Sequence, residues 1–253
     1  MESVKTVLIT QARTGSTRLP GKVLLKVQGQ ELLKIHLDRL QQCKLIDQII
    51  VATTISAEDD AIAQLCVSWG IDFSRGMVDD VLDRFYTSTK NIRPDWIVRV
   101  TSDCPLIDPR LVDAVVAFAQ TNNVDYASNV LLEHFPDGQD VEVMKFSALE
   151  KAWKESVLKS DREHVTPFIR NNSSFKGGML FLSMNFPCVA DYSAVRMTVD
   201  EAKDFDLIER IVSDLGVDQS WMTYTNYIID NQLDKINSNI IRNEGMIKSL
   251  KND

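Results

Sequence analysis

Short apolar segments alternate with longer amphipathic segments over the first half of the chain. Branched apolar residues, which are typical of strands, fill residues 7–9, 46–54, 71–73 and 96–101. Apolar residues at helical spacing predict helices over residues 31–43, 56–70 and 109–121. This alternation predicts a parallel sheet covered by helices, an α/β fold. Because ligands of such sheets bind beyond the carboxyl ends of the strands, we expect a site in the loops after residues 9 and 51.

The loop after the first of these strands is rich in cationic, hydroxyl and glycine residues. It contains Arg13, Gly15, Ser16, Thr17, Arg18, Gly21 and Lys22. Glycine lets the backbone approach a ligand, backbone N–H groups form a cradle for anions, and arginine offers paired donors that suit phosphate. In a chain with a formal net charge of −8, this indicates a polyphosphate site. Neither GxxxxGKS/T nor GxGxxG spacing is present, so a basic surface turn is the alternative.

The string QARTGSTRLPGK, residues 11–22, resembles the signature of the nucleotide-sugar cytidylyltransferases, a group that includes 3-deoxy-manno-octulosonate and acylneuraminate cytidylyltransferases. Within that group the chain is most similar to the branch of the spore-coat polysaccharide biosynthesis protein F. The resemblance covers nearly the whole chain. It implies a GT-A-like, Rossmann-related three-layer sandwich around a mixed, mainly parallel sheet. It also implies transfer of CMP from CTP to a sugar or sugar acid, with magnesium and with release of pyrophosphate.

The resemblance assigns the nucleotide to the first loop and to residues near the next two strands. The nucleotide contacts that it implies are Ala12, Arg13, Gly15, Ser16, Thr17, Arg18, Lys22, Thr53, Arg75, Asp80 and Arg84. Among these, Arg13 and Lys22 would compensate the charge of the leaving pyrophosphate and so act in catalysis. The residues alone leave an alternative for the last three, because residues 74–84 also fit a capped helix start with a local ion pair.

Two aspartates far apart in the sequence are the candidate metal ligands. Asp103 follows the apolar strand 96–101, and Asp200 lies where an extended segment meets a new helix. Each has a structural alternative, as a turn residue for Asp103 and as a helix cap for Asp200. The resemblance places the family's magnesium-binding, catalytic aspartates at both positions. One departure concerns Cys104, since the keto-sugar-acid enzymes commonly carry an acidic residue there, which leaves the identity of the sugar open.

Residues 130–190 are expected to form an inserted, substrate-side portion. In residues 140–143, Asp140 and Glu142 alternate with valines, so one strand face is buried and one is presented, either to a sugar or to solvent. The strings DGQDVEV and REHVTPFI match the branch and favour substrate contacts by Asp140, Glu142 and His164, and Arg196 is a candidate for binding a substrate carboxylate or phosphate.

We expect a single nucleotidyltransferase domain over residues 1–253. Residues 175–183 are predicted as a strand, and its edge is where relatives build a dimer, so the resemblance implies a homodimer. Residues 226–253 are predicted to form a docking helix and a short end without chemistry of its own.

Composition excludes several classes of protein. The pI near 5.0 argues against nonspecific binding of nucleic acid or of an anionic membrane. The four cysteines form no CxxC pair, which is typical of reduced thiols in the cytosol. The sequence shows neither a signal peptide nor an apolar run of membrane-spanning length. We therefore expect a cytoplasmic protein.

Two other functions are compatible with these residues. One is a nucleotidyltransferase that acts on a sugar 1-phosphate with another NTP, and the other is a GT-A-fold protein that binds nucleotide-sugar without transferring nucleotide. Pyrophosphate release with each NTP in turn distinguishes the three.

Overall fold

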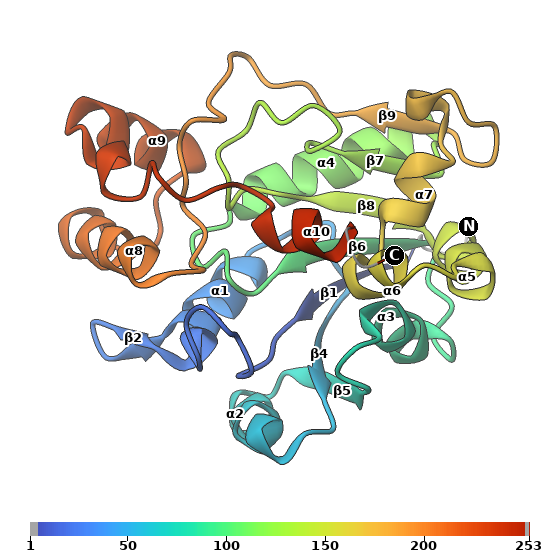
Figure 1. Ribbon diagram of the computed structural model, residues 1–253, viewed down its shortest axis with the longest axis horizontal. Helices are drawn as coiled ribbons and strands as arrows, with labels where there is room; N and C mark the ends of the chain where they lie inside the picture. Colours follow the sequence, from blue (N-terminus) through green and yellow to red (C-terminus); the bar gives the residue numbers. More distant parts are fainter. Residues whose placement is uncertain (1–4, 251–252) are drawn as a thin grey trace.

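The computed structural model describes residues 5–250 and 253, and its centre is a seven-stranded sheet (Figure 1). The strand order is β5-β4-β1-β6-β8-β7-β9. The strands are β1 (Thr6–Gln11), β4 (Gln48–Thr54), β5 (Asp72–Gly76), β6 (Trp96–Thr101), β7 (Tyr126–Ser128), β8 (Glu142–Lys145) and β9 (Ser183–Asn185). Only β8 runs antiparallel to its neighbours, so the predicted mixed, mainly parallel sheet is confirmed.

Helices cover both faces of the sheet (Figure 1). They are α1 (Leu32–Leu40), α2 (Asp60–Trp69), α3 (Val81–Thr89), α4 (Pro109–Asn122), α5 (Phe146–Glu155), α6 (Lys159–His164), α7 (Pro167–Asn171), α8 (Ala202–Leu215), α9 (Trp221–Asp230) and α10 (Glu244–Ser249). A small hairpin, β2 (Lys26–Val27) with β3 (Gln30–Glu31), precedes α1.

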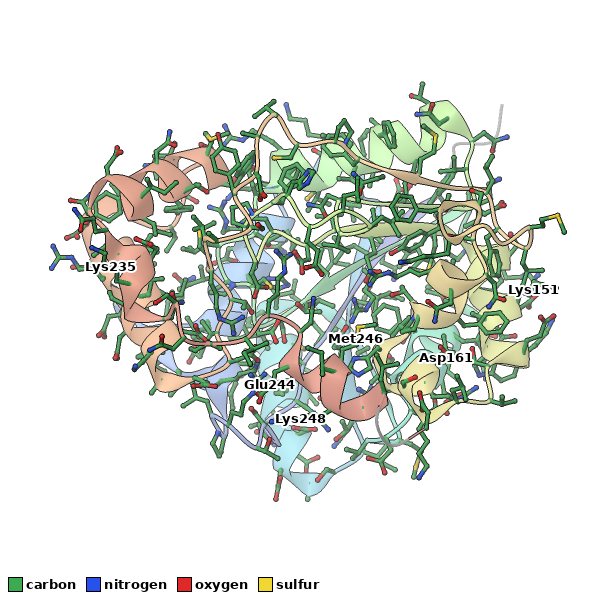
Figure 2. The ribbon with its side chains drawn as sticks, turned by 45° about the horizontal axis from the view of Figure 1, so that its top comes forward. Lys151, Asp161, Lys235, Glu244, Met246 and Lys248 are labelled. Atoms are coloured by element: carbon green, nitrogen blue, oxygen red, sulfur yellow. The ribbon has the colours of Figure 1, made fainter. Side chains whose placement is uncertain are left out.

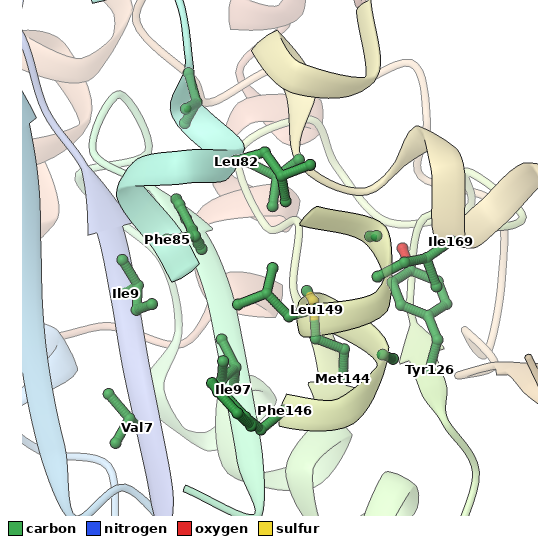
Figure 3. Close-up of a cluster of buried hydrophobic side chains, with 14 of the residues drawn as sticks. Val7, Ile9, Leu82, Phe85, Ile97, Tyr126, Met144, Phe146, Leu149 and Ile169 are labelled. Atoms are coloured by element: carbon green, nitrogen blue, oxygen red, sulfur yellow. The ribbon is translucent and has the colours of Figure 1, made fainter. Parts of the chain in front are cut away.

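The alternation of side chains along β1 explains the layers. Val7 and Ile9 point to one face, where α3, α5 and α7 contribute buried side chains (Figure 3). Leu8 points to the other face and packs against residues of α4. A strand that helices bury on both faces needs a continuous run of apolar residues. Residues 7–9 supply that run.

Residues 130–190 contribute two strands to the main sheet. Within this range β8 lies between β6 and β7, and β9 forms the edge beside β7. The predicted strand over 175–183 is wrong in most of its length, because residues 174–176 form a 3-10 turn and Gly177 adopts a φ of +81°.

None of the helices in residues 5–250 and 253 combines the length and the apolar character needed to cross a bilayer.

Gly138 lies in the turn before β8, where its backbone packs against the extended segment that carries Arg196. Its φ is +104°, and an added Cβ would lie 2.7 Å from the backbone of Met197 and Thr198. We expect Gly138→Ala to lower the free energy of unfolding by about 2 kcal/mol or more, since both the conformation and the contact oppose a side chain. Urea denaturation measures this. Gly245→Ala is the control, because nothing lies within 4 Å of its Cβ position, and equal stability of the two variants would contradict the expectation.

Candidate active site

Two adjoining cavities open at the carboxyl ends of β1 and β6. The large cavity has a volume of about 980 Å³ and the small cavity about 240 Å³. Residues that line both are Gln11, Arg18, Thr101, Asp103, His164, Asp200, Glu244 and Gly245. The two candidate metal ligands therefore lie on the boundary between the cavities.

The loop after β1 is fixed to the neighbouring strand and helix. The Thr14 backbone N–H and hydroxyl both donate to Asp59, at 2.7 and 2.8 Å, and the Gly21 N–H donates to the Thr14 carbonyl at 2.8 Å. Gly21 has a φ of +69°, so the chain turns sharply into the short 3-10 helix that begins at Lys22. The loop residues that line the large cavity are Ala12, Arg13, Ser16, Thr17, Arg18 and Lys22, whereas Gly15 lies in the loop outside that lining.

Lys22 connects the two aspartates. Its Nζ donates to Asp103 at 2.9 Å and to Asp200 at 2.8 Å. Burial by itself would lower the pKa of Lys22, but the charges of Asp103 and Asp200 outweigh burial and raise it. Burial would likewise raise the pKa of Asp103, yet the Lys22 ammonium holds it well below its usual range. Both aspartates thus converge on a single cation.

Asp200 is held from the protein side by two arginines. Arg18 and Arg196 each reach it at 2.9 Å. Arg196 is fixed in turn by Asp204, at 2.9 Å, and by Asp137. The N-cap of α8 is Glu201, which forms a capping box with Asp204, so Asp200 is not the helix cap and its carboxylate remains directed at the cavity.

The carboxylates of Asp103 and Asp200 fit a divalent ion that takes only a few of its ligands from the protein. Among residues 5–250 and 253, no group of three or more His, Cys, Asp or Glu side chains forms a metal cluster. Magnesium keeps several waters and needs only one or two carboxylates beside substrate phosphates. The ammonium between Asp103 and Asp200 shows that their oxygens can share one cation.

Cys104 and His36 lie beneath the turn that carries Asp103. His36 is fully buried, and its Nδ1 lies 2.9 Å from the Cys104 carbonyl, so Nδ1 carries the proton. Its Nε2 then accepts from the Thr10 hydroxyl at 3.0 Å. Burial raises the pKa of the Cys104 thiol well above its usual value, so the thiol remains protonated where the keto-sugar-acid enzymes carry an acidic residue.

The predicted nucleotide contacts outside the first loop are Thr53, Arg75, Asp80 and Arg84, and they separate into two groups. Asp80 and Arg84 line the large cavity. Asp80 also caps α3 through the Asp83 N–H and pairs with Arg162 at 2.6 Å. By contrast, Thr53 is fully buried in β4 and Arg75 donates to the backbone of Thr54 and Ser56, so neither lines a cavity.

The predicted substrate contacts Asp140, Glu142, His164 and Arg196 all line the small cavity. Glu142 is buried, where it binds Arg99 of β6 and Tyr126 of β7, so the strand face that carries it is not a solvated one. Arg242 donates to Asp140 at 2.8 Å, yet burial raises the pKa of Asp140 to about 7. Burial lowers the pKa of His164.

The C-terminal segment contributes to both cavities, although the sequence predicted no chemistry there. Glu244 and Met246 of α10 line the small cavity, and Glu244 and Lys248 line the large one. Figure 2 labels these three side chains on α10. Glu244 approaches Arg18 at 3.5 Å. Sequence reasoning also missed Arg99 and Arg170. A charged residue inside the apolar strand WIVRVT was the available signal for Arg99, and Arg170 had none.

A loop rich in arginine and hydroxyl residues lies beside two converging carboxylates at the end of a mainly parallel sheet, which is an arrangement that suits a nucleotidyltransferase. The family model described as cytidylyltransferase matches residues 7–237, and the chain belongs to this family. The family confirms the prediction of a CTP-dependent enzyme.

Similar proteins span most of the chain. An uncharacterized protein of Methanocaldococcus jannaschii is 46% identical over 81% of this chain and 82% of its own. The spore coat polysaccharide biosynthesis protein SpsF of Bacillus subtilis is 30% identical over 83% of this chain and 87% of its own. The structure of a cytidylyltransferase from Leptospira borgpetersenii superposes with a TM-score of 0.86 at 30% identity and covers 94% of this chain and 99% of that one.

His36 makes stability depend on pH. Burial lowers its pKa from 6.5 to about 4, so between these values the unfolded chain binds a proton that the folded chain does not. The free energy of unfolding should therefore fall as the pH drops from 6.5 to 4. Relative to His36→Gln, which does not titrate, the wild type should lose about 3 kcal/mol between pH 7 and pH 4. Urea denaturation at a series of pH values measures the difference, and parallel curves would contradict the expectation.

Proposed function

We propose that the protein transfers CMP from CTP to a hydroxyl of a sugar or sugar acid, with release of pyrophosphate, in the synthesis of a surface polysaccharide. The observation that carries this proposal is the position of Asp103 and Asp200 on the boundary between a large and a small cavity. A triphosphate in the first and a sugar in the second would bring the α-phosphate and the attacking hydroxyl together at these carboxylates. The polysaccharide role is supported by the name of the Bacillus subtilis relative.

Seven cationic and six acidic side chains line the large cavity, and two of the acidic ones are the candidate metal ligands Asp103 and Asp200. In a chain of formal net charge −8, it concentrates cationic side chains of the first loop and of α3, α6 and α10. These are Arg13, Arg18, Lys22, Arg84, Lys159, Arg162 and Lys248. Nucleotidyl transfer is an in-line displacement in which positioning and charge neutralisation supply most of the catalysis, so no covalent enzyme intermediate is needed.

Asp103 and Asp200 would hold magnesium, and their fit rests on the shared cation described above. When bound there, a divalent ion neutralises phosphate charge and lowers the pKa of a nearby hydroxyl. The chain's own part is to keep the pair in place: Arg18 and Arg196 hold Asp200, and the backbone N–H of Val199 donates to the Asp103 carbonyl at 2.7 Å.

Asp103→Asn should lower the rate of pyrophosphate release with CTP and acceptor by about 100-fold or more, because one anionic oxygen for the metal is lost. The fold should be kept, as judged by circular dichroism. Asp38→Asn, which removes a half-buried carboxylate that pairs with Lys34 and accepts from Gln30 outside both cavities, is the control and should keep the full rate. A wild-type rate in Asp103→Asn would remove this residue from the mechanism.

Seven carboxylates and four arginines line the small cavity, and we propose that one of these arginines binds an anionic group of the acceptor. The cavity volume of about 240 Å³ corresponds to roughly eight waters, which suits one monosaccharide. Arg18, Arg99 and Arg196 all pair with carboxylates of the chain. Arg170 of α7 forms no ion pair within 4 Å among the described residues, and its guanidinium donates to the Val130 carbonyl at 3.4 Å. Burial by itself would lower the pKa of Arg170, but Tyr126 and the more distant carboxylates of Glu142, Glu133 and Asp140 raise it. A substrate carboxylate would give this guanidinium a direct partner, which favours a sugar acid.

Arg170→Gln should raise the KM for a keto sugar acid such as 3-deoxy-manno-octulosonate by about tenfold or more, because a charge-assisted hydrogen bond is lost. The KM for CTP should be unchanged. Arg93→Gln, which removes an exposed arginine paired with Glu150, is the control. If the acceptor is instead a sugar 1-phosphate used with another NTP, pyrophosphate will be released with that pair and not with CTP and the sugar acid.

A homodimer in the cytoplasm remains part of the proposal. Its support is the edge strand β9 with the exposed apolar side chains Leu180, Leu182 and Met184 near it. Four free cysteines are consistent with a reducing compartment.

A further inference from the structure

The ammonium of Lys22 occupies the position from which a cation can contact both Asp103 and Asp200. Its Nζ lies 2.9 Å from one carboxylate and 2.8 Å from the other, and the residue is 9% exposed. These are the same carboxylates that a divalent ion would need. A metal–oxygen distance near 2.1 Å would place that ion against the ammonium.

The two cations exclude each other by charge. Asp200 already accepts from Arg18 and Arg196 in addition to Lys22. Adding a divalent ion beside three positive groups would bring like charges within a few ångströms in a partly buried site, where they repel strongly. Lys22 is the one of the three that contacts both carboxylates, whereas Arg18 reaches Asp200 and Arg196 is fixed by Asp204 and Asp137.

Lys22 has both the freedom and the space to leave. Its backbone is fixed, since the N–H of Lys22 donates to the Leu19 carbonyl at 3.2 Å and the N–H of Leu25 donates to the Lys22 carbonyl at 3.1 Å. Its side chain is a flexible four-carbon stem that also lines the large cavity, beside Arg13 and Ser16. Phosphates in that cavity would offer the ammonium a new anionic partner.

We infer that Lys22 is an internal counter-ion that blocks the carboxylate pair to metal until nucleotide phosphates draw it into the large cavity. Binding of metal and binding of nucleotide are then positively coupled through one side chain. The inference rests on the proposed function, because it takes the metal to bind at Asp103 and Asp200 and the triphosphate in the large cavity.

The decisive measurement is the affinity of the full chain for Mn²⁺ without nucleotide. The electron paramagnetic resonance signal of free Mn²⁺ reports how much of the ion is unbound. Lys22→Met keeps the length of the side chain and removes its charge, and it should bind Mn²⁺ at least tenfold more tightly than the wild type. Lys26→Met, which removes a largely exposed lysine paired with Glu31, should match the wild type. Adding Asp103→Asn to Lys22→Met should abolish the gain.

Acetylation of lysines in the wild type, read by mass spectrometry, gives a second measurement that does not depend on folding of a variant. Saturating Mn²⁺ should raise labelling of Lys22 several-fold over the metal-free protein and leave Lys26 unchanged. Equal Mn²⁺ affinity of wild type and Lys22→Met, or unchanged labelling of Lys22, would overturn the inference and leave CMP transfer as proposed. If Asp103→Asn has no effect on Mn²⁺ binding in any background, the proposed metal site fails as well.

Discussion

Asp103 and Asp200 lie close together in one wall because cations reach them from several parts of the chain. Both carboxylates are partly exposed, and like charges so close together repel unless cations lie between them. Lys22 comes from the loop after β1, Arg196 from the extended segment before α8, and Arg18 from the tip of the first loop. These ion pairs join the first loop, the turn after β6 and the start of α8 at one place.

The sheet supplies the rigid part of this arrangement. β1 and β6 are paired over six positions from Thr6 with Trp96 to Gln11 with Thr101, so both strands end at the same level. The first loop and the Asp103 turn therefore leave the sheet side by side. Beneath them the neutral His36 links Thr10 of β1 to the Cys104 carbonyl, which ties the two strand ends together from below.

The shape of the small cavity depends on the antiparallel strand β8. Because Arg99 of β6 lies directly opposite Glu142 of β8, a buried ion pair forms its floor. Gly138 then lets the chain pass close to the backbone of Met197 and Thr198, which brings Asp137 to Arg196. The tail adds the outer wall, with Arg242 on Asp140 and Glu244 near Arg18. One continuous network thus connects the wall of the large cavity to that of the small cavity.

The sequence by itself determined the α/β class, the position of the β1 loop and the family, because apolar periodicity and a local string of residues carry that information. It also placed Asp103 and Asp200 as a pair, through the resemblance. Only the tertiary structure showed that Thr53 and Arg75 lie outside the cavities, that no carboxylate of the described residues lies within ion-pair distance of Arg170 and that α10 forms part of the wall. Those facts depend on strand register and on contacts between residues more than a hundred positions apart, as between Arg18 and Glu244. Local patterns in a sequence do not specify which distant side chains meet, since packing of the whole chain decides it.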